Sequence, residues 1–307
     1  MKVIHAPGEL PNGGRKVCLA IGVFDGVHLG HQQIIRQTVT DAGQHAAWSA
    51  VVTFDRHPNA VVAPDRVPPQ IYSGPQKLRT IAGLGVDALL EIHFDQSFSE
   101  QPGERFVREL AAGFGKIHSV CVGADFVFGH RRTGNVALLE KLGAELHFQV
   151  HGLAAVALDG LAVSSTRIRD LIRAGNLDGA SQMLGRPYRI AGQVVAGDRM
   201  GRKLGFPTAN LAAANLVLPP HGVYSAIIHW QGRLYQAALN IGFRPTVASA
   251  RPQLRVEAHL LDFDGDLYGQ ELELEVGAKL RDEIRFNSPA ELRRQIALDV
   301  AAVRGTE

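Results

Sequence analysis

Two histidines lie three residues apart in a glycine-rich stretch near the N-terminus, between a short apolar run and an expected helix. The stretch from Ile21 to His31 reads I-G-V-F-D-G-V-H-L-G-H. The first N–H groups of a helix lack partners and its dipole favours negative charge, so a helix start can bind an anion. His28 and His31 are therefore candidates to stabilise the charge that builds on a nucleoside triphosphate during phosphoryl or nucleotidyl transfer.

Two other interpretations of the histidine pair remain open. Zinc can be bound by histidine, but such a site needs further His, Cys or carboxylate ligands at a recognisable spacing, and none is adjacent. The pair could also be ordinary polar loop residues. The surrounding glycines and Asp25 favour the phosphate interpretation.

A second candidate phosphate site begins at residue 164, where the chain reads S-S-T-R-I-R-D-L-I. Serines suit the cap of a helix, whereas arginines in its first turns are unfavourable unless an anion is bound there. That conflict between local rule and sequence is expected of a phosphate site.

The elements that must position these residues alternate between short apolar strands and helices. Strands are expected at 17–21, 49–54, 87–94, 117–122 and 145–150, and helices at 32–39, 74–84, 103–114, 136–142, 165–172 and 177–184. This alternation predicts a doubly wound α/β sheet, in which ligands bind beyond the carboxyl ends of the strands. The polar loops at 22–31, 53–58 and 123–129 should converge at that edge.

From residue 185 the pattern changes to strands separated by glycine-containing turns, without intervening helices. Strands are expected at 189–196, 223–229, 234–241, 254–261 and 271–276, which is the spacing of an antiparallel barrel. A capping box with proline at the first helical position, Ser288 to Glu291, predicts a C-terminal helix. We therefore expect two domains, a Rossmann-like parallel domain over 1–184 and a barrel domain over 185–307.

Glycines and basic residues gather again from Gly197 to Asn210, which reads G-D-R-M-G-R-K-L-G-F-P-T-A-N. Backbone N–H groups of such a loop can cradle phosphates, and the Thr208 hydroxyl beside the Asn210 amide suits Mg²⁺ and phosphate oxygens. The loop is not a Walker A motif, because Leu204 follows Lys203 and no parallel-sheet pattern surrounds it. A plain flexible loop is the alternative.

Composition gives no global attraction to nucleic acid or membranes. The 307 residues include 32 basic and 30 acidic side chains, with no basic stripe interleaved with aromatics. The first 15 residues lack the apolar core of a signal peptide, and no apolar run approaches the ~20 residues of a membrane span. Cys18 and Cys121 lie in apolar runs and are expected to be buried thiols. We expect a cytoplasmic protein of unknown oligomeric state.

The histidine loop and three later motifs together resemble the bifunctional riboflavin kinase/FMN adenylyltransferase family, the prokaryotic FAD synthetases. The later motifs follow in the family's order: T-F-D-R-H-P at 53–58, G-A-D-F-V-F-G at 123–129 and S-S-T-R-I-R at 164–169. The 197–210 loop is similar to the family's flavokinase motif, as are 240–246, 256–260, 268–269 and 280–286. Arg56 stands where the family pattern has a proline, and Asn135 where an aspartate is common.

The resemblance implies two reactions that use ATP and Mg²⁺. The first domain would transfer AMP from ATP to the phosphate of FMN, giving FAD and pyrophosphate. The barrel would transfer the γ-phosphoryl of ATP to the ribityl 5′-hydroxyl of riboflavin. An alcohol is a poor nucleophile, so a carboxylate base is wanted, and Glu257 occupies the matching family position. A solvent-facing strand glutamate is the alternative for Glu257.

Carried over by position, the resemblance also implies the binding residues. For adenylyl transfer, ATP and its phosphates would be bound by Gly22, Phe24, Asp25, Gly26, His28 and His31, and at the second helix start by Ser164, Ser165, Thr166 and Arg169. The flavin and nucleotide pocket would be formed by Phe54, His57, Asp125, Phe126 and Phe128, although core packing is an equal alternative for each single phenylalanine. The kinase would bind ATP through Gly201, Lys203, Gly205, Pro207, Thr208 and Asn210, Mg²⁺ through Thr208 and Asn210, and flavin through Arg281.

Other functions compete with this hypothesis. The first domain alone could be a cytidylyltransferase or another adenylyltransferase, but the flavokinase-like barrel argues against both. A flavin-binding sensor or storage protein derived from the family is the alternative of a different class. The catalytic residue types retained in both motifs, from His28 to Glu257, argue against it.

Overall fold

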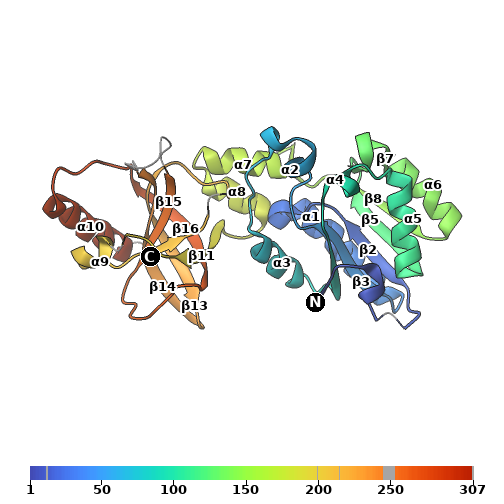
Figure 1. Cartoon of the computed structure of the whole chain (residues 1–307), viewed down its shortest axis with the longest axis horizontal. Coiled ribbons are helices and arrows are strands. Elements are labelled where there is room, and N and C mark those ends of the chain that lie inside the picture. The colour runs from blue at the N-terminus through green and yellow to red at the C-terminus, as the bar shows by residue number, and fades with distance from the viewer. Residues whose placement is uncertain (12, 199, 214, 245–252, 306–307) are drawn as a thin grey trace. The chain divides into compact units, whose positions relative to one another are not determined.

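Six parallel strands form the central sheet of the N-terminal part, in the order β1-β4-β3-β2-β5-β8 (Figure 1). They are β1 (Lys2–Ile4), β2 (Val17–Ile21), β3 (Trp48–Phe54), β4 (Ala88–Ile92), β5 (Ile117–Gly123) and β8 (Gln149–Leu153). Every residue of β2 is buried, as expected of a central strand covered on both faces. Because β3 and β4 lie on one side of β2 while β5 and β8 lie on the other, the strand order reverses between β2 and β5.

Helices cover both faces of this sheet, which confirms the predicted doubly wound fold. On one face, α1 (Leu29–Gln44) and α3 (Gly74–Ala82) contribute Ile35 and Ile81 to the core. On the other, α5 (Gly103–Phe114) and α6 (Val136–Leu146) contribute Phe106 and Leu139. The shorter elements are η1 (Pro7–Glu9), η2 (Asp25–Val27), α2 (Asn59–Val62), η3 (Pro64–Arg66), α4 (Gln96–Ser99), β6 (Val127–Phe128), η4 (His130–Arg132), β7 (Gly134–Asn135), β9 (Ala157–Leu158) and β10 (Leu161–Ala162).

The computed structural model describes the chain except residues 12, 199, 214, 245–252 and 306–307. The chain divides into two compact units, which we call the sheet unit (1–68 and 74–165) and the barrel unit (69–73 and 166–307). Helices α7 (Ser165–Arg173) and α8 (Leu177–Leu184) precede the barrel strands in the sequence.

The barrel unit contains a closed antiparallel barrel in the order β11-β12-β15-β14-β13-β16, which confirms the second predicted fold. Its strands are β11 (Arg189–Val195), β12 (Ala209–Leu211), β13 (Gly222–Trp230), β14 (Arg233–Arg244), β15 (Gln253–Leu260) and β16 (Glu271–Arg281). On β15, Val256 and Ala258 are buried, whereas Arg255, Glu257 and His259 are partly exposed. The period of two therefore places the polar side chains of this strand outside the barrel core.

Several details differ from the prediction. Helix α6 continues to Leu146, so β8 begins at Gln149 rather than at residue 145; His147, with a φ of 63°, ends the helix. The barrel strands are interrupted by a short helix, α9 (Met200–Leu204). The three-residue strands β1 and β12 were not predicted, because segments this short carry little periodicity. Strand β1 forms its ladder with β4 at the edge of the sheet.

The predicted C-terminal helix, α10 (Pro289–Arg304), is joined to β16 by an ion pair. Arg281 donates from Nε and Nη2 to the two carboxylate oxygens of Asp299, each at 2.8 Å. The Asp299 residue is only 6% exposed. Removing one partner of such a pair leaves the other charge poorly solvated.

We expect Asp299→Ala to lower the free energy of unfolding of the barrel unit by about 3 kcal/mol, because Arg281 loses its buried counter-ion. Urea denaturation with hydrogen exchange of the α10 amides measures the loss. Asp282→Ala is the matched control, since it removes an exposed carboxylate paired with Lys279, and it should leave the urea midpoint unchanged. Equal effects of the two variants would contradict this account.

Candidate active sites

The histidine loop leaves β2 at the reversal of strand order and leads into α1. Phe24, Gly26 and Val27 have left-handed backbone φ values of 54°, 76° and 40°, which carry a free-energy cost in residues other than glycine. A Cβ at Gly22 would lie 3.0 Å from the ring of Phe24. That ring is buried in the core, so packing holds the loop in its strained path.

The rings of His28 and His31 stack at the start of α1, with centroids 3.6 Å apart and planes inclined by 19°. His28 is 6% exposed, and its Nδ1 accepts a hydrogen bond from the backbone N–H of His31 at 3.4 Å. In the neutral tautomer this leaves Nε2 of His28 as a donor. Phe24 contacts His31 edge-on, at 5.2 Å between centroids. Two imidazoles therefore lie at a helix N-terminus, as the sequence predicted.

Ser165, in the candidate phosphate motif at 164–169, forms a hydrogen bond with the histidine loop. Its hydroxyl donates to the backbone carbonyl of Asp25 at 3.0 Å, and the Asp25 residue is 8% exposed. Ser164 is partly buried and Thr166 is exposed. Arg169 belongs to the barrel unit, where it is buried and donates from Nε to the carbonyl of Pro69 at 2.8 Å. The phosphate-binding role of these four residues stays a prediction.

A cavity of about 870 Å³ opens at the carboxyl ends of the strands. Its lining includes Ile21, the last residue of β2, and residues from all three predicted loops: Val23 of the first, Phe54, His57 and Pro58 of the second, and Phe126, Val127, Phe128 and Gly129 of the third. The loops at 22–31, 53–58 and 123–129 therefore converge. Asp125 is exposed in the turn after β5 and lies outside this lining.

Six phenylalanine rings form one wall of this cavity, which we call the aromatic wall. Adjacent ring centroids are 5.2–5.9 Å apart along the pairs Phe54–Phe94, Phe94–Phe98, Phe98–Phe106, Phe106–Phe128 and Phe128–Phe126. Such a wall suits a large, flat ring system that can stack or make edge contacts. Sequence reasoning missed Phe94, Phe98 and Phe106, because an apolar residue facing a cavity resembles one facing the core.

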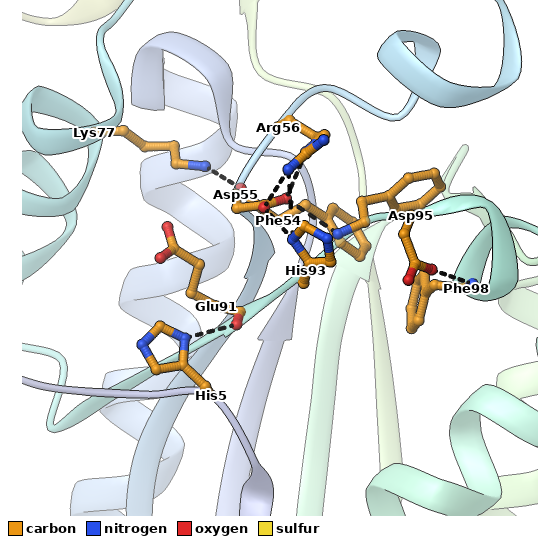
Figure 2. A network of polar contacts seen from close by, with 10 residues as sticks. His5, Phe54, Asp55, Arg56, Lys77, Glu91, His93, Asp95 and Phe98 are labelled. Carbon is orange, nitrogen blue, oxygen red and sulfur yellow. Dashed lines mark hydrogen bonds and ion pairs between the residues drawn. The ribbon is translucent and has the colours of Figure 1, made fainter.

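A polar network around Asp55 fixes the end of β3 beside the aromatic wall (Figure 2). Asp55 accepts hydrogen bonds from the backbone N–H of Phe94 at 3.1 Å, from His93 at 2.7 Å and from Arg56 at 3.2 Å. Partial burial acts to raise the pKa of Asp55, but these hydrogen bonds outweigh it and hold the pKa below its usual value. Arg56, one of the two departures from the family pattern, is therefore a partner of this carboxylate.

The other departure, Asn135, caps α6. Its Oδ1 accepts from the backbone N–H of Leu138 at 2.9 Å. Aspartate and asparagine cap helices about equally well, so the substitution preserves the structural task.

Lys77 binds the end of β3, and β3 in turn contacts the base of the histidine loop. Its ammonium donates to the carbonyl of Phe54 at 2.8 Å and to the hydroxyl of Thr53 at 3.4 Å, and Thr53 in turn donates to the carbonyl of Val23 at 3.1 Å. Figure 2 shows the lysine reaching the end of β3 from α3. Burial lowers the pKa of Lys77, against the opposing effect of nearby carboxylates led by Glu91. No sequence motif pointed to this lysine.

We expect Lys77→Met to lower the rate of the reaction at the sheet unit about tenfold, because the end of β3, which contacts Val23 through Thr53, loses its lysine donor and small misplacements are costly in catalysis. Initial rates at saturating substrate measure the change, with the reaction of the barrel unit as an internal standard. Lys116→Met, at an exposed lysine, is the matched control and should keep the wild-type rate. Equal rates for wild type and Lys77→Met would contradict the positioning role.

The second site is built by strand register on the barrel. Asn210 of β12 and Asn240 of β14 both pair directly with Glu257 of β15. These three residues and Thr208 line a cavity of about 220 Å³. Antiparallel pairing thus brings together residues that are far apart in the sequence.

An arginine holds the Glu257 carboxylate in place. Nη1 of Arg255 lies 3.5 Å from Oε1 of Glu257 and 2.9 Å from a carboxylate oxygen of Asp198. Asp198, Asn240 and Arg255 line the cavity but were not predicted as site residues. Their nearness to Glu257 depends on strand pairing, which local motifs do not show.

The glycine-rich loop approaches the same cavity through α9. A Cβ at Gly201 would lie 2.4 Å from the carbonyl oxygen of Phe206 and 3.3 Å from the Thr208 hydroxyl, so only glycine allows this approach. Gly205 has a φ of 89°, another position that favours glycine. Arg199 of this loop, and residues 245 and 246 of the 240–246 motif, lie outside the described residues.

The other predicted kinase residues lie at or beyond the edge of this cavity. Pro207 and Thr208 line an adjoining cavity of about 470 Å³, and Nδ1 of His259 donates to the carbonyl of Pro207 at 2.7 Å. Lys203 is exposed and lies outside both linings. Arg281, the predicted flavin ligand, makes the ion pair with Asp299 and also lies outside them. Glu283 takes part in the smaller lining.

A doubly wound sheet with two stacked histidines at a helix N-terminus, and a separate barrel with a carboxylate-bearing polar cavity, are typical of a two-site, nucleotide-dependent transferase. Comparison with known families agrees: residues 11–167 match the family model of FAD synthetase, and residues 184–306 match that of riboflavin kinase. The chain belongs to the bifunctional riboflavin kinase/FMN adenylyltransferase family.

Relatives support this membership along the whole chain. The chain is 37% identical over 306 residues to the bifunctional riboflavin kinase/FMN adenylyltransferase of Escherichia coli K12, covering 99% of this chain and 97% of the relative. It is 40% identical over 305 residues to that of Pseudomonas fluorescens, with the same coverage. A solved structure titled as a macrolide-efflux protein from Streptococcus pneumoniae matches all of both chains with a TM-score of 0.82 and 26% identity.

These comparisons establish the activity. The chain phosphorylates riboflavin to FMN and adenylylates FMN to FAD, each with ATP. The alternative of a sensor or storage protein has no support among them. In the described part of the chain, no helix has the length and apolar character needed to cross a membrane.

Proposed function

We propose that the two reactions take place at the two cavities described above. FMN would bind against the aromatic wall and be adenylylated beside the histidine loop. Riboflavin would be phosphorylated at the Glu257 cavity of the barrel. The observation that carries the first assignment is the single cavity lined by both the start of the histidine loop and the six phenylalanine rings.

In adenylyl transfer, a phosphate oxygen of FMN attacks the α-phosphorus of ATP, and the bond from that phosphorus to the leaving pyrophosphate breaks. No side-chain nucleophile is needed, so positioning and charge stabilisation supply most of the rate. His28 would donate from Nε2 to an ATP phosphate oxygen, and its neighbour His31 would share this task. The stacked rings at the N-terminus of α1 support these roles.

In the kinase reaction, Glu257 would accept the proton of the ribityl 5′-hydroxyl as its oxygen attacks the γ-phosphorus of ATP. Support comes from its place in the cavity, with Arg255 fixing the carboxylate. Thr208 and Asn210 supply hard oxygen ligands beside this carboxylate, which fits Mg²⁺ held jointly with ATP phosphates. Bound there, Mg²⁺ would neutralise phosphate charge.

We further propose a domain boundary between residues 184 and 185, which is supported by the two family matches at 11–167 and 184–306. We also propose that the enzyme acts in the cytoplasm. The buried free thiols Cys18 and Cys121 are consistent with a reducing compartment.

A variant at each proposed site should remove one activity and leave the other intact. Glu257→Gln should lower FMN formation from riboflavin at least about 100-fold through loss of the base, and leave FAD formation from FMN intact. His28→Asn should lower FAD formation by about 100-fold through loss of a charge-stabilising donor, and leave FMN formation intact. Chromatography of reactions with riboflavin or FMN, ATP and Mg²⁺ measures both.

The retained activity of each variant is the control for correct folding. Wild-type kinase activity in Glu257→Gln would contradict the assigned base, and wild-type FAD formation in His28→Asn would contradict the assigned histidine. Chelation with EDTA should stop FMN formation, and added Mg²⁺ should restore it.

A further inference from the structure

A turn that contains a histidine and two arginines, His130 to Arg132, borders the cavity of the aromatic wall. It forms η4, between the paired strands β6 and β7. All three residues line the cavity, whose other walls include the phenylalanine rings and the start of the histidine loop.

The backbone of this turn is held in a costly conformation. Arg131 and Arg132 have left-handed φ values of 51° and 59°, which an arginine seldom adopts. Close packing of glycines helps to impose this path, since a Cβ at Gly129 would lie 2.3 Å from the backbone nitrogen of Gly103. A Cβ at Gly134, on β7, would lie 2.6 Å from the ring of Phe128.

Hydrogen bonds then fix the turn to the segment before α5. The backbone N–H of His130 donates to the carbonyl of Gln101 at 2.8 Å, and Nδ1 of His130 lies 3.2 Å from the carbonyl of Ser99. The Thr133 hydroxyl accepts from the backbone N–H of Gly103 at 3.1 Å. Surroundings that enforce strain in this way are typical of functional sites.

The charges on this turn are not balanced within the described structure. Both arginines are exposed, and neither guanidinium has a hydrogen-bond or ion-pair partner among the described residues. Glu100 is the one carboxylate among the described residues that line the cavity, and it accepts a hydrogen bond from Gln96 at 2.8 Å. The border of an otherwise aromatic cavity is thus positively charged.

We propose that Arg131 and Arg132 bind the 5′-phosphate of FMN, so that this turn makes the site select FMN over unphosphorylated flavins. The proposal rests on adenylyl transfer taking place at this cavity. FMN combines a flat ring with a dianionic phosphate, and the cavity combines an aromatic wall with two guanidinium groups on a rigid turn. Arginine pairs with phosphate through two parallel hydrogen bonds, which fixes both the position and the orientation of the attacking oxygens.

Kinetics of FAD formation test this assignment in Arg131→Gln, Arg132→Gln and the double variant. We expect KM for FMN to rise about tenfold in each single variant and about 100-fold in the double variant, with KM for ATP within twofold of wild type. Lumiflavin has the ring system without the ribityl phosphate, so its inhibition constant against FMN should not change. Riboflavin kinase activity should stay at the wild-type level.

Three further variants separate the effect of losing a guanidinium charge from an effect on folding. Arg131→Gly should raise KM for FMN as Arg131→Gln does without lowering Tm, since glycine adopts positive φ readily. Arg131→Lys should restore part of the affinity. Arg105→Gln is the matched control, because this exposed arginine of α5 pairs with Glu109 and lies outside the cavity lining, and KM for FMN should not change.

Phe128→Ala distinguishes failure of this inference from failure of the proposed site. Suppose that Phe128→Ala weakens the binding of both FMN and lumiflavin while the arginine variants leave KM for FMN unchanged. The flavin site then stands and the phosphate assignment falls. If Phe128→Ala affects neither ligand, the cavity is not the flavin site. A rise in KM for ATP instead of FMN, or a parallel loss of lumiflavin affinity in the arginine variants, would also overturn the proposal.

Discussion

The strand order of the parallel sheet reverses between β2 and β5, and the proposed adenylyl-transfer site depends on this reversal. Loops that leave adjacent parallel strands toward opposite sides leave a crevice at the carboxyl ends, where ligands bind. The loop after β2 supplies the stacked histidines, and the segment after β5 supplies Phe126, Phe128 and the arginine turn. Core packing around Phe24 and the hydrogen bond from Thr53 to the Val23 carbonyl then hold the histidine loop against the sheet.

In the barrel, strand register rather than loop geometry positions the residues of the proposed site. Asn210, Glu257 and Asn240 form a row across three adjacent strands because each lies opposite the next in the antiparallel ladder. The period of two keeps Val256 and Ala258 in the core while Glu257 faces outward. The proposed kinase site therefore needs no polar group inside the barrel, and the apolar core is kept intact beneath it.

The features that depend on local patterns of residues could be predicted from the sequence. Alternating strands and helices led to the doubly wound sheet, spaced strands led to the barrel, and short motifs led to residues that the structure places together, such as His28 with His31 and Thr208 with Glu257. The sequence did not reveal features that depend on contacts between distant segments. Lys77 matters through hydrogen bonds to a neighbouring strand end, and three rings of the aromatic wall read as ordinary core. The roles of all the predicted site residues stay predictions. Asp125, Lys203 and Arg281 lie outside the described cavity linings, as do His28 and His31.

A crystal structure of the enzyme with FMN and α,β-methylene-ATP, which cannot release pyrophosphate, tests most directly that adenylyl transfer takes place where the sheet reverses. We predict the triphosphate at the N-terminus of α1, with an oxygen within hydrogen-bonding distance of Nε2 of His28, and the flavin ring against the aromatic wall in the same cavity. A complex with both substrates ordered in the sheet unit but the triphosphate away from the histidine loop, or the flavin ring outside this cavity, would contradict the account.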